Sequence, residues 1–234
     1  MATYEVGVWG TETLHNKQGN DVLDTIATFI ERGAERAGKD VSAIARSTPI
    51  PAPTEEIKNS FSAESPCYYN TTLTYSDLLD WWESYWDCNY LDYATDSNLL
   101  VTHNGPYYGG GLGNISGPNC VANGYGIASW RDTYTYSGST SGGSYSMKSC
   151  MHEVGHNVLK ANTGDPDGDG KTQHDVGTTY DTSQGISVTV MNATPDYFDY
   201  LKNGNECNYH PPTSSFDRIS FRYSNCCQGK WEKK

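Results

Sequence analysis

The spacing of hydrophobic residues along this chain shifts repeatedly between the repeat of a strand and that of a helix. After Gly19, apolar side chains return every three or four residues up to Ala37, which predicts an amphipathic helix. Runs rich in β-branched, aromatic or continuous apolar residues predict strands, and a Thr-x-x-Asp box at Thr74 predicts the start of a second helix. The resulting order is typical of an α/β (α+β) protein with a mixed, twisted sheet. The predicted strands are 3–9, 41–47, 97–102 and 126–130, and the predicted helices are 20–37, one from 74 onward, and 145–160.

The third predicted helix contains an HExxH motif, His152-Glu-Val-Gly-His156. Its apolar residues fall on one side of the helix, and the two histidines, one turn apart, fall on the other. Two histidines at this spacing can bind one zinc ion, which lowers the pKa of a bound water to about 7. Glu153 is placed to take a proton from that water and pass it to the leaving amine. The motif therefore predicts catalytic zinc. The apolar side comprises Met147, Met151, Val154 and Val158.

Composition favours an exported protein. The chain has 28 Asp and Glu against 16 Lys and Arg, a net charge of −12, and so lacks the basic surface that nucleic-acid binding requires. Aliphatic residues are few, but 18 Tyr, 6 Trp and 7 Cys supply rings and disulfides that can stiffen a core. No apolar run is long enough to span a membrane. We therefore expect a secreted, extracellular protein, its signal and any propeptide removed.

A catalytic zinc site needs a third protein ligand. No Glu occurs between Glu153 and Glu206, which argues against a glutamate ligand one helix downstream. His174 is the only His between His156 and His210, and it follows a glycine-rich turn. His174 is therefore the expected third ligand.

Together these features resemble the metzincin zinc endopeptidases, most closely their reprolysin (adamalysin-like) branch. The HExxH motif with Gly155 and Asn157, and His174 followed by Asp175, match the motif of that branch, and Met191 in a turn before a proline matches its Met-turn. The resemblance covers most of the chain in element order but only residues 109–195 in motif.

The resemblance implies a metzincin-like fold and site. Three main helices and the sheet would form an upper lobe, about residues 1–160, above an irregular, disulfide-tied lower lobe, about 161–234. Met191 would form a hydrophobic floor under the metal, and an extended substrate would pair with a glycine-rich edge strand through main-chain hydrogen bonds. The assigned residues are His152, His156 and His174 as zinc ligands, Glu153 as base, and Gly111, Leu112, Gly113, Asn114 and Ile115 as the edge strand.

The chain departs from the family between the second and third histidines. Leu159 stands where metzincins have a glycine, Asn162 stands where they have the third histidine, and His174 comes 18 residues after His156. Either Asn162 or a nearby Asp replaces the ligand, or a loop has been inserted before His174. The inserted sequence favours the loop.

The inserted sequence contains the first half of a calcium-binding loop. Asp165, Asp167 and Asp169, followed by Gly170, occupy positions 1, 3, 5 and 6 of such a loop. The acidic residue expected at position 12 is missing, although Asp175 lies one place before it. Asp-Gly sequences are also ordinary turns, so a structural calcium ion and a plain turn both remain open.

A rival third ligand is Asp181. Gly177-Thr-Thr-Tyr-Asp181 loosely resembles the Gly-Thr-x-Asp segment of the aspzincins, whose third ligand is Asp, but its spacing differs by one residue. Met191 would then have no assigned role.

The seven cysteines lack the C-x-x-C spacing of a thiolate metal site, so we expect disulfides whose connectivity the sequence does not fix. One pair would anchor the loop before the second helix, and the family resemblance suggests links to the C-terminal end. The expected pairs are Cys67 with Cys88, Cys120 with Cys226 or Cys227, and Cys150 with Cys207, leaving one cysteine over.

The sequence thus predicts one catalytic domain over residues 1–234, a secreted, monomeric zinc endopeptidase acting on proteins or peptides. A non-catalytic module that uses metal ions only for stability is the competing class. Glu153 argues against it, because a structural zinc site has no use for that carboxylate. Asn-x-Ser/Thr triplets occur at Asn70, Asn114 and Asn192 and carry little weight as sequence alone.

Overall fold

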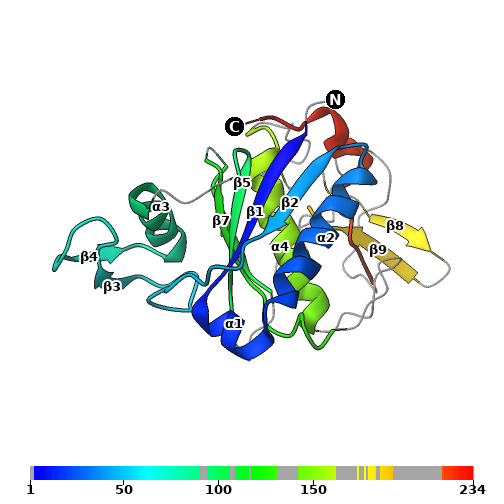
Figure 1. Ribbon diagram of the computed structural model, residues 1–234. Helices are drawn as coiled ribbons and strands as arrows, with labels where there is room; N and C mark the ends of the chain where they lie inside the picture. Colours follow the sequence, from blue (N-terminus) through cyan, green and yellow to red (C-terminus); the bar gives the residue numbers. More distant parts are fainter. Residues whose placement is uncertain are drawn as a thin grey trace.

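The computed structural model describes residues 3–89, 94–105, 109–115, 117–130, 142–161, 173, 177, 179–182, 185–191 and 218–233. A central sheet has helices on both of its faces (Figure 1). This confirms the predicted mixed α/β class.

The central sheet consists of β1 (Tyr4–Gly10), β2 (Val41–Ala45), β5 (Ser97–Thr102), β6 (Gly111–Gly113) and β7 (Asn119–Asn123). Its strand order is β2-β1-β5-β7-β6, and β6 is the last strand. Neighbouring strands are parallel except for β6, which runs antiparallel to β7. Every residue of β5 is buried, as expected for a parallel strand covered on both faces.

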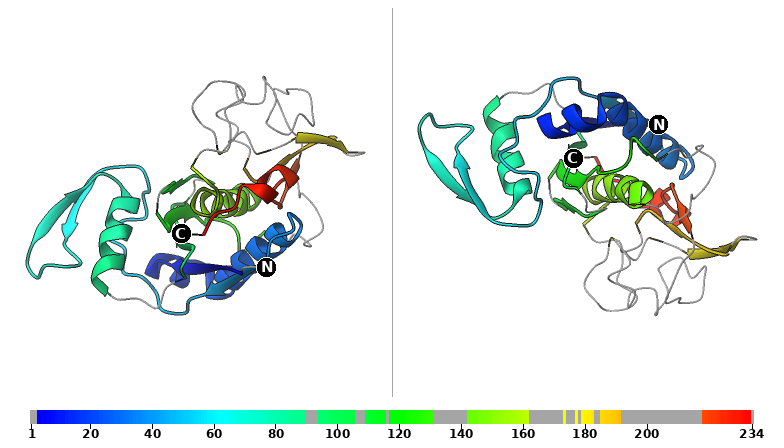
Figure 2. Two further views of the ribbon diagram at one scale, coloured as in Figure 1. Left: turned by 90° about the horizontal axis from the view of Figure 1, so that it is seen from above. Right: turned by 90° about the horizontal axis from the view of Figure 1, so that it is seen from below.

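Four α-helices are described: α1 (Glu12–Gln18), α2 (Asp21–Glu35), α3 (Leu78–Asn89) and α4 (Gly142–Val158). Helices α2 and α4 cover one face of the sheet, and α3 covers the other (Figures 1 and 2). None of the described helices is both long and apolar enough to cross a membrane.

Alternate residues of one strand serve two hydrophobic cores. Leu99 and Val101 of β5 pack under α2 and α4, whereas Leu100 packs under α3. Rings fill much of the second core, where the indoles of Trp9 and Trp82 lie 6.1 Å apart between centroids. Aromatic side chains thus supply volume that the few aliphatic residues do not.

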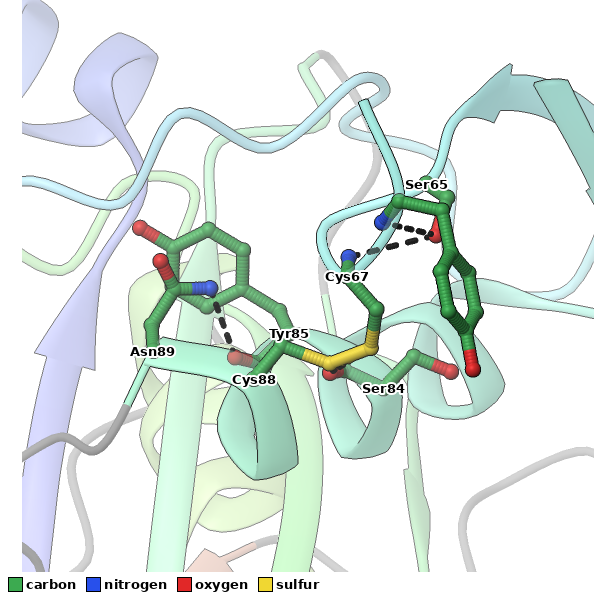
Figure 3. Close-up of a disulfide and its surroundings, with 7 residues drawn as sticks. Ser65, Cys67, Ser84, Tyr85, Cys88 and Asn89 are labelled. Carbon is green, nitrogen blue, oxygen red and sulfur yellow. Dashed lines mark hydrogen bonds between the residues drawn. A yellow bond between two sulfur atoms is a disulfide. The ribbon is translucent and has the colours of Figure 1, made fainter. Parts of the chain in front are cut away.

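Helix α3 and the hairpin of β3 (Phe61–Glu64) and β4 (Thr72–Tyr75) form a unit that projects from the second face (Figures 1 and 2). A disulfide between Cys67 and Cys88 ties the loop of the hairpin to α3, with the two Cα atoms 5.1 Å apart (Figure 3). The predicted pairing of these cysteines is confirmed.

The C-terminal third contains a small sheet where an irregular region was expected. Strands β8 (Thr179–Thr182), β9 (Gly185–Thr189) and β10 (Arg218–Ser220) have the order β10-β9-β8 and are followed by a 3₁₀ helix, Asn225–Gly229. The end of the chain returns to the main core, where the ring of Trp231 is buried.

Two predicted elements differ from the structure. The second predicted helix starts at Leu78 and not at Thr74, which lies in β4, because the side chain of Asp77 caps it by accepting from the backbone N–H of Asp80 at 2.9 Å. The strand predicted over 126–130 is a turn, and β7 lies just before it. Helix α1 was not predicted.

Among the cysteines that the structure describes, Cys120, Cys150 and Cys227 are free thiols inside the main core. The predicted pairings of Cys120 with Cys226 or Cys227, and of Cys150 with Cys207, are therefore wrong, although Cys226 is disulfide-bonded. The family pattern failed because these thiols pack as small apolar side chains.

Candidate metal centre

Helix α4 places His152 and His156 one turn apart, and their imidazole rings converge. The two Nε2 atoms are 3.1 Å apart, and the ring planes are perpendicular. The helical repeat brings the two residues to one side of α4, as the sequence predicts. His152 is only 6% exposed, whereas His156 is partly exposed.

The outer nitrogen of His152 is held by the main chain. Its Nδ1 lies 2.8 Å from the carbonyl oxygen of Val190. A carbonyl oxygen can only accept a hydrogen bond, so Nδ1 is the protonated nitrogen, and Nε2 keeps its lone pair.

The outer nitrogen of His156 is held by Gln173. The Nε2 group of this side chain donates to the carbonyl oxygens of His156, Leu159 and Lys160 at 3.0 to 3.2 Å. Its Oε1 therefore faces the imidazole and accepts from the Nδ1 of His156 at 2.6 Å. Hence the second histidine also presents an unprotonated Nε2.

This arrangement fits zinc. Two nitrogen ligands of a tetrahedral zinc ion, each bound at about 2.05 Å, lie about 3.3 Å apart. The observed separation of 3.1 Å is close to that value, and the opposed lone pairs repel each other unless a cation lies between them. Burial also lowers the pKa of His156, which favours the neutral imidazole that metal binding requires.

Glu153 lies against the edge strand β6. A Cβ atom added to Gly111 would overlap the Cγ of Glu153 and lie 2.7 Å from its Oε1. A Cβ at Gly113 would lie 3.1 Å from its Oε2 and 2.8 Å from the Cβ of His156. The two glycines therefore allow the helix to approach the strand closely, with the carboxylate between them.

Glu153 is 7% exposed, and its burial raises the pKa of its carboxyl group to about 8. The positive charges of Lys58 and Lys148 oppose the rise. Lys148, one turn before His152, is itself buried, and burial lowers the pKa of its amino group to about 8. Two buried ionisable groups, one carboxyl and one amino, thus lie on the helix that carries the histidine pair.

Serine side chains of α4 hold the segment that leads into β6. The hydroxyl of Ser146 accepts from the backbone N–H of Gly109 at 3.1 Å, and that of Ser149 accepts from Gly110 at 2.9 Å. These bonds satisfy backbone donors beside the sheet edge and fix its distance from α4.

Asn157 links α4 to the turn after β6. Its Nδ2 donates to the carbonyl oxygens of Asn114, Gly117 and Asn119 at 2.9 to 3.1 Å. Its Oδ1 accepts from the hydroxyl of Ser97 at 2.7 Å. Asn157 is completely buried, so its single amide fixes α4, the antiparallel β6–β7 pair and β5 relative to one another.

Met191 packs against the HExxH helix. A Cβ atom added to Gly155 would overlap the Sδ of Met191, so the glycine of the motif makes room for this side chain. Met191 is fully buried and follows Val190, which holds His152. The contact that the structure shows is thus with Gly155 of the motif, and the role of Met191 as a floor under a metal stays a prediction.

The structure thus brings together His152, Glu153 and His156, the edge strand and Met191. His174, Asp165, Asp167, Asp169 and Asp175 lie outside the described residues, and Asp181 lies in β8, where it pairs with Ile186. Among the described residues, no three His, Cys, Asp or Glu side chains form a group that could hold a metal ion.

Sequence reasoning missed the residues that position this site. Gln173 and Val190 form hydrogen bonds that depend on distant segments, so no local pattern reveals them. Lys148 could have been noticed in the sequence, because this charged residue directly follows Met147, one of the apolar positions of the predicted helix. Asn157 was noted only as part of the motif.

No known family model matches this chain, and no curated protein matches it with significant similarity.

Proposed function

We propose that this protein is a secreted zinc-dependent endopeptidase of the metzincin type. The supporting observation is the convergence of the Nε2 atoms of His152 and His156 beside the buried carboxyl group of Glu153. When bound, zinc supplies a Lewis acid that polarises a scissile carbonyl and lowers the pKa of water.

Glu153 acts as general base and then as general acid. Burial raises the pKa of its carboxyl group to about 8 in the metal-free protein, and a zinc ion held by the two histidines would lower that pKa and favour the carboxylate that accepts a proton. It accepts a proton from the attacking water and donates it to the leaving amine.

The edge strand β6 gives the site a place for an extended peptide. β6 ends the central sheet, and its glycines bring its backbone against Glu153. A peptide that adds to this edge is held by main-chain hydrogen bonds, with its scissile bond near the carboxyl group. This geometry favours protein and peptide substrates.

The third ligand in this proposal is His174. Gln173, the residue before it in the sequence, hydrogen bonds to His156, so the chain is held at the second histidine one residue before the predicted ligand. Separate His174→Ala and Asp181→Ala variants test which of the two residues is the third zinc ligand. Loss of zinc from the Asp181 variant alone would replace the metzincin assignment by the aspzincin one.

The decisive experiment combines zinc analysis by mass spectrometry with casein hydrolysis. We expect one zinc per chain in the wild type and in Glu153→Gln, and a turnover at least about 100-fold lower in the variant. Glu232→Gln, a change at an exposed residue, serves as the matched control and keeps full activity. Zinc-loaded wild type that is no faster than Glu153→Gln would instead support a non-catalytic module.

Residues 165–175 provide the proposed structural calcium site. Adding calcium to the zinc-saturated, calcium-free protein then raises its melting temperature, and Asp167→Asn abolishes the rise. Equal melting curves with and without calcium would leave this sequence as an ordinary turn.

A further inference from the structure

The loop of the β3–β4 hairpin contains a tight turn around Asn70. The backbone N–H of Thr71 donates to the carbonyl oxygen of Tyr68 at 3.2 Å, and Asn70 has a φ of 55°. This is the third position of a type II turn, where asparagine is one of the few residues that tolerate a positive φ. The turn exposes Asn70 to solvent.

Local bonds make this turn a fixed structure. The Ser65 hydroxyl accepts from the backbone N–H groups of Cys67 and Tyr68 at 3.2 and 3.1 Å, and the Ser65 N–H donates to the carbonyl of Thr71 at 2.7 Å. The disulfide from Cys67 then joins the loop to α3 (Figure 3). The hairpin that carries the turn lies on the side of the sheet opposite α4 (Figure 1), so a group attached there is anchored on the other side of the sheet from the histidine pair.

Two Asn-x-Thr/Ser triplets, both of which match the acceptor motif, differ in the structural environment of their asparagine. The Nδ2 of Asn114 donates to Glu83 at 2.5 Å, and its Oδ1 accepts from the N–H of Gly117 at 3.0 Å, so this amide is committed within the fold. Asn70 and Thr72 are both exposed, and within the described part of the chain no hydrogen bond engages the Asn70 side chain. The third triplet, at Asn192, lies outside the described residues.

Exposed hydrophobic side chains gather around Asn70. Tyr69 is 93% exposed, Tyr68 is 65% exposed, and Leu73, directly after the triplet, is also exposed. Such a concentration at one loop is unusual for a surface that only water contacts. The apolar face of a sugar ring packs well on aromatic rings, so a glycan on Asn70 would cover these side chains.

We propose that Asn70 is an N-glycosylation site. In the reaction, an N–H bond of the Asn70 amide is replaced by a bond from Nδ2 to the anomeric carbon of an oligosaccharide. The donor is a lipid-pyrophosphate-linked oligosaccharide, and the lipid pyrophosphate leaves while the amide proton is lost. The inference rests on the export that the proposed function includes, but not on peptidase activity.

The test is secretion of the full chain from cultured eukaryotic cells, with intact masses measured before and after treatment with peptide N-glycosidase. We expect a glycan mass that the enzyme removes, and conversion of Asn70 to Asp in the mapped peptide. Asn70→Gln and Thr72→Ala abolish the added mass, whereas Thr71→Ala, at the unconstrained middle position, retains it. The protein retained inside the cells is measured as well, so that glycosylation can be determined even for a variant that is secreted poorly.

An unmodified Asn70 in folded, exported protein would overturn the proposal, and so would an unchanged glycan mass in Asn70→Gln. Zinc content and casein hydrolysis, measured on the same samples, are expected to equal those of the wild type. A protein that carries the glycan but lacks hydrolysis would contradict the peptidase function and leave the glycosylation site standing.

Discussion

Replacement of Asn157 by Ala tests whether one buried amide holds α4 against the antiparallel β6–β7 pair. The change removes both N–H donors that three carbonyl groups share, and the acceptor that the Ser97 hydroxyl uses. Counting these as three hydrogen bonds, each contributing about 1 kcal/mol, gives a loss of about 3 kcal/mol in the free energy of unfolding. For a domain of this size the melting temperature falls by about 6 to 12 °C.

The assay is urea unfolding of zinc-saturated protein, followed by tryptophan fluorescence and extrapolated to water. Ser97→Ala removes one of the bonds and is expected to cost about 1 kcal/mol, and the double variant is expected to cost less than the sum. Asn16→Ala, an exposed asparagine in α1, is the matched control and stays within about 0.5 kcal/mol of the wild type.

The same variants distinguish a loss of activity caused by a displaced edge strand from a loss caused by unfolding. Below its melting transition, Asn157→Ala is expected to keep its zinc but to lose about tenfold or more in kcat/KM, because the edge strand is no longer fixed relative to Glu153. A loss of stability below 1 kcal/mol for Asn157→Ala would refute the reasoning, since the amide would then not hold the two elements together.

Three further predictions concern the packing and protonation of the site and core. Gly111→Ala forces a Cβ against Glu153 and is expected to lower kcat/KM about 100-fold, whereas Gly229→Ala, which meets no atom within 4 Å, leaves it unchanged. In metal-free protein, folding raises the pKa of Glu153 from 4.5 to about 8, so its contribution to stability is full below pH 4.5 and is lost as the pH rises to about 8. The melting temperature of metal-free Glu153→Gln should therefore rise relative to wild type across this range, and a constant difference would contradict the burial of the carboxyl group. Because burial raises the pKa of the three free core thiols, alkylation and peptide mapping at pH 8 should find them unmodified in native protein and modified in urea.

The failures of the sequence-based prediction have local physical causes. The helix expected from Thr74 begins later because Asp77 supplies a better-placed cap, while Thr74 extends a hairpin. The strand expected over 126–130 is a turn in which Gly126 has a φ of 81°. Helix α1 has seven residues, too few for a clear apolar repeat. In the first two cases a local interaction or backbone conformation outweighed a weak pattern, and in the third the element was too short to show one.

Cysteine pairing failed for a different reason. Cys67 and Cys88 were paired correctly because a loop and its following helix lie near each other in the sequence as well as in space. The partner of Cys120 was inferred from a family pattern and that of Cys150 from the cysteines that remained, and in this fold both side chains fill the main core as free thiols.

The sequence by itself determined the buried strand β5, the helix α4 and the side of α4 from which His152 and His156 project. It could do so because the repeat of a helix or strand depends only on the order of consecutive residues. Only the tertiary structure decided what faces that side: the carbonyl of Val190, the amide of Gln173 and the backbone of β6. These groups come from segments far apart in the chain, and their approach depends on packing of the whole core, which no local pattern encodes. A sequence can thus name the histidines that are candidates for metal binding, whereas the fold fixes which of their nitrogens carries the proton and where Glu153 lies.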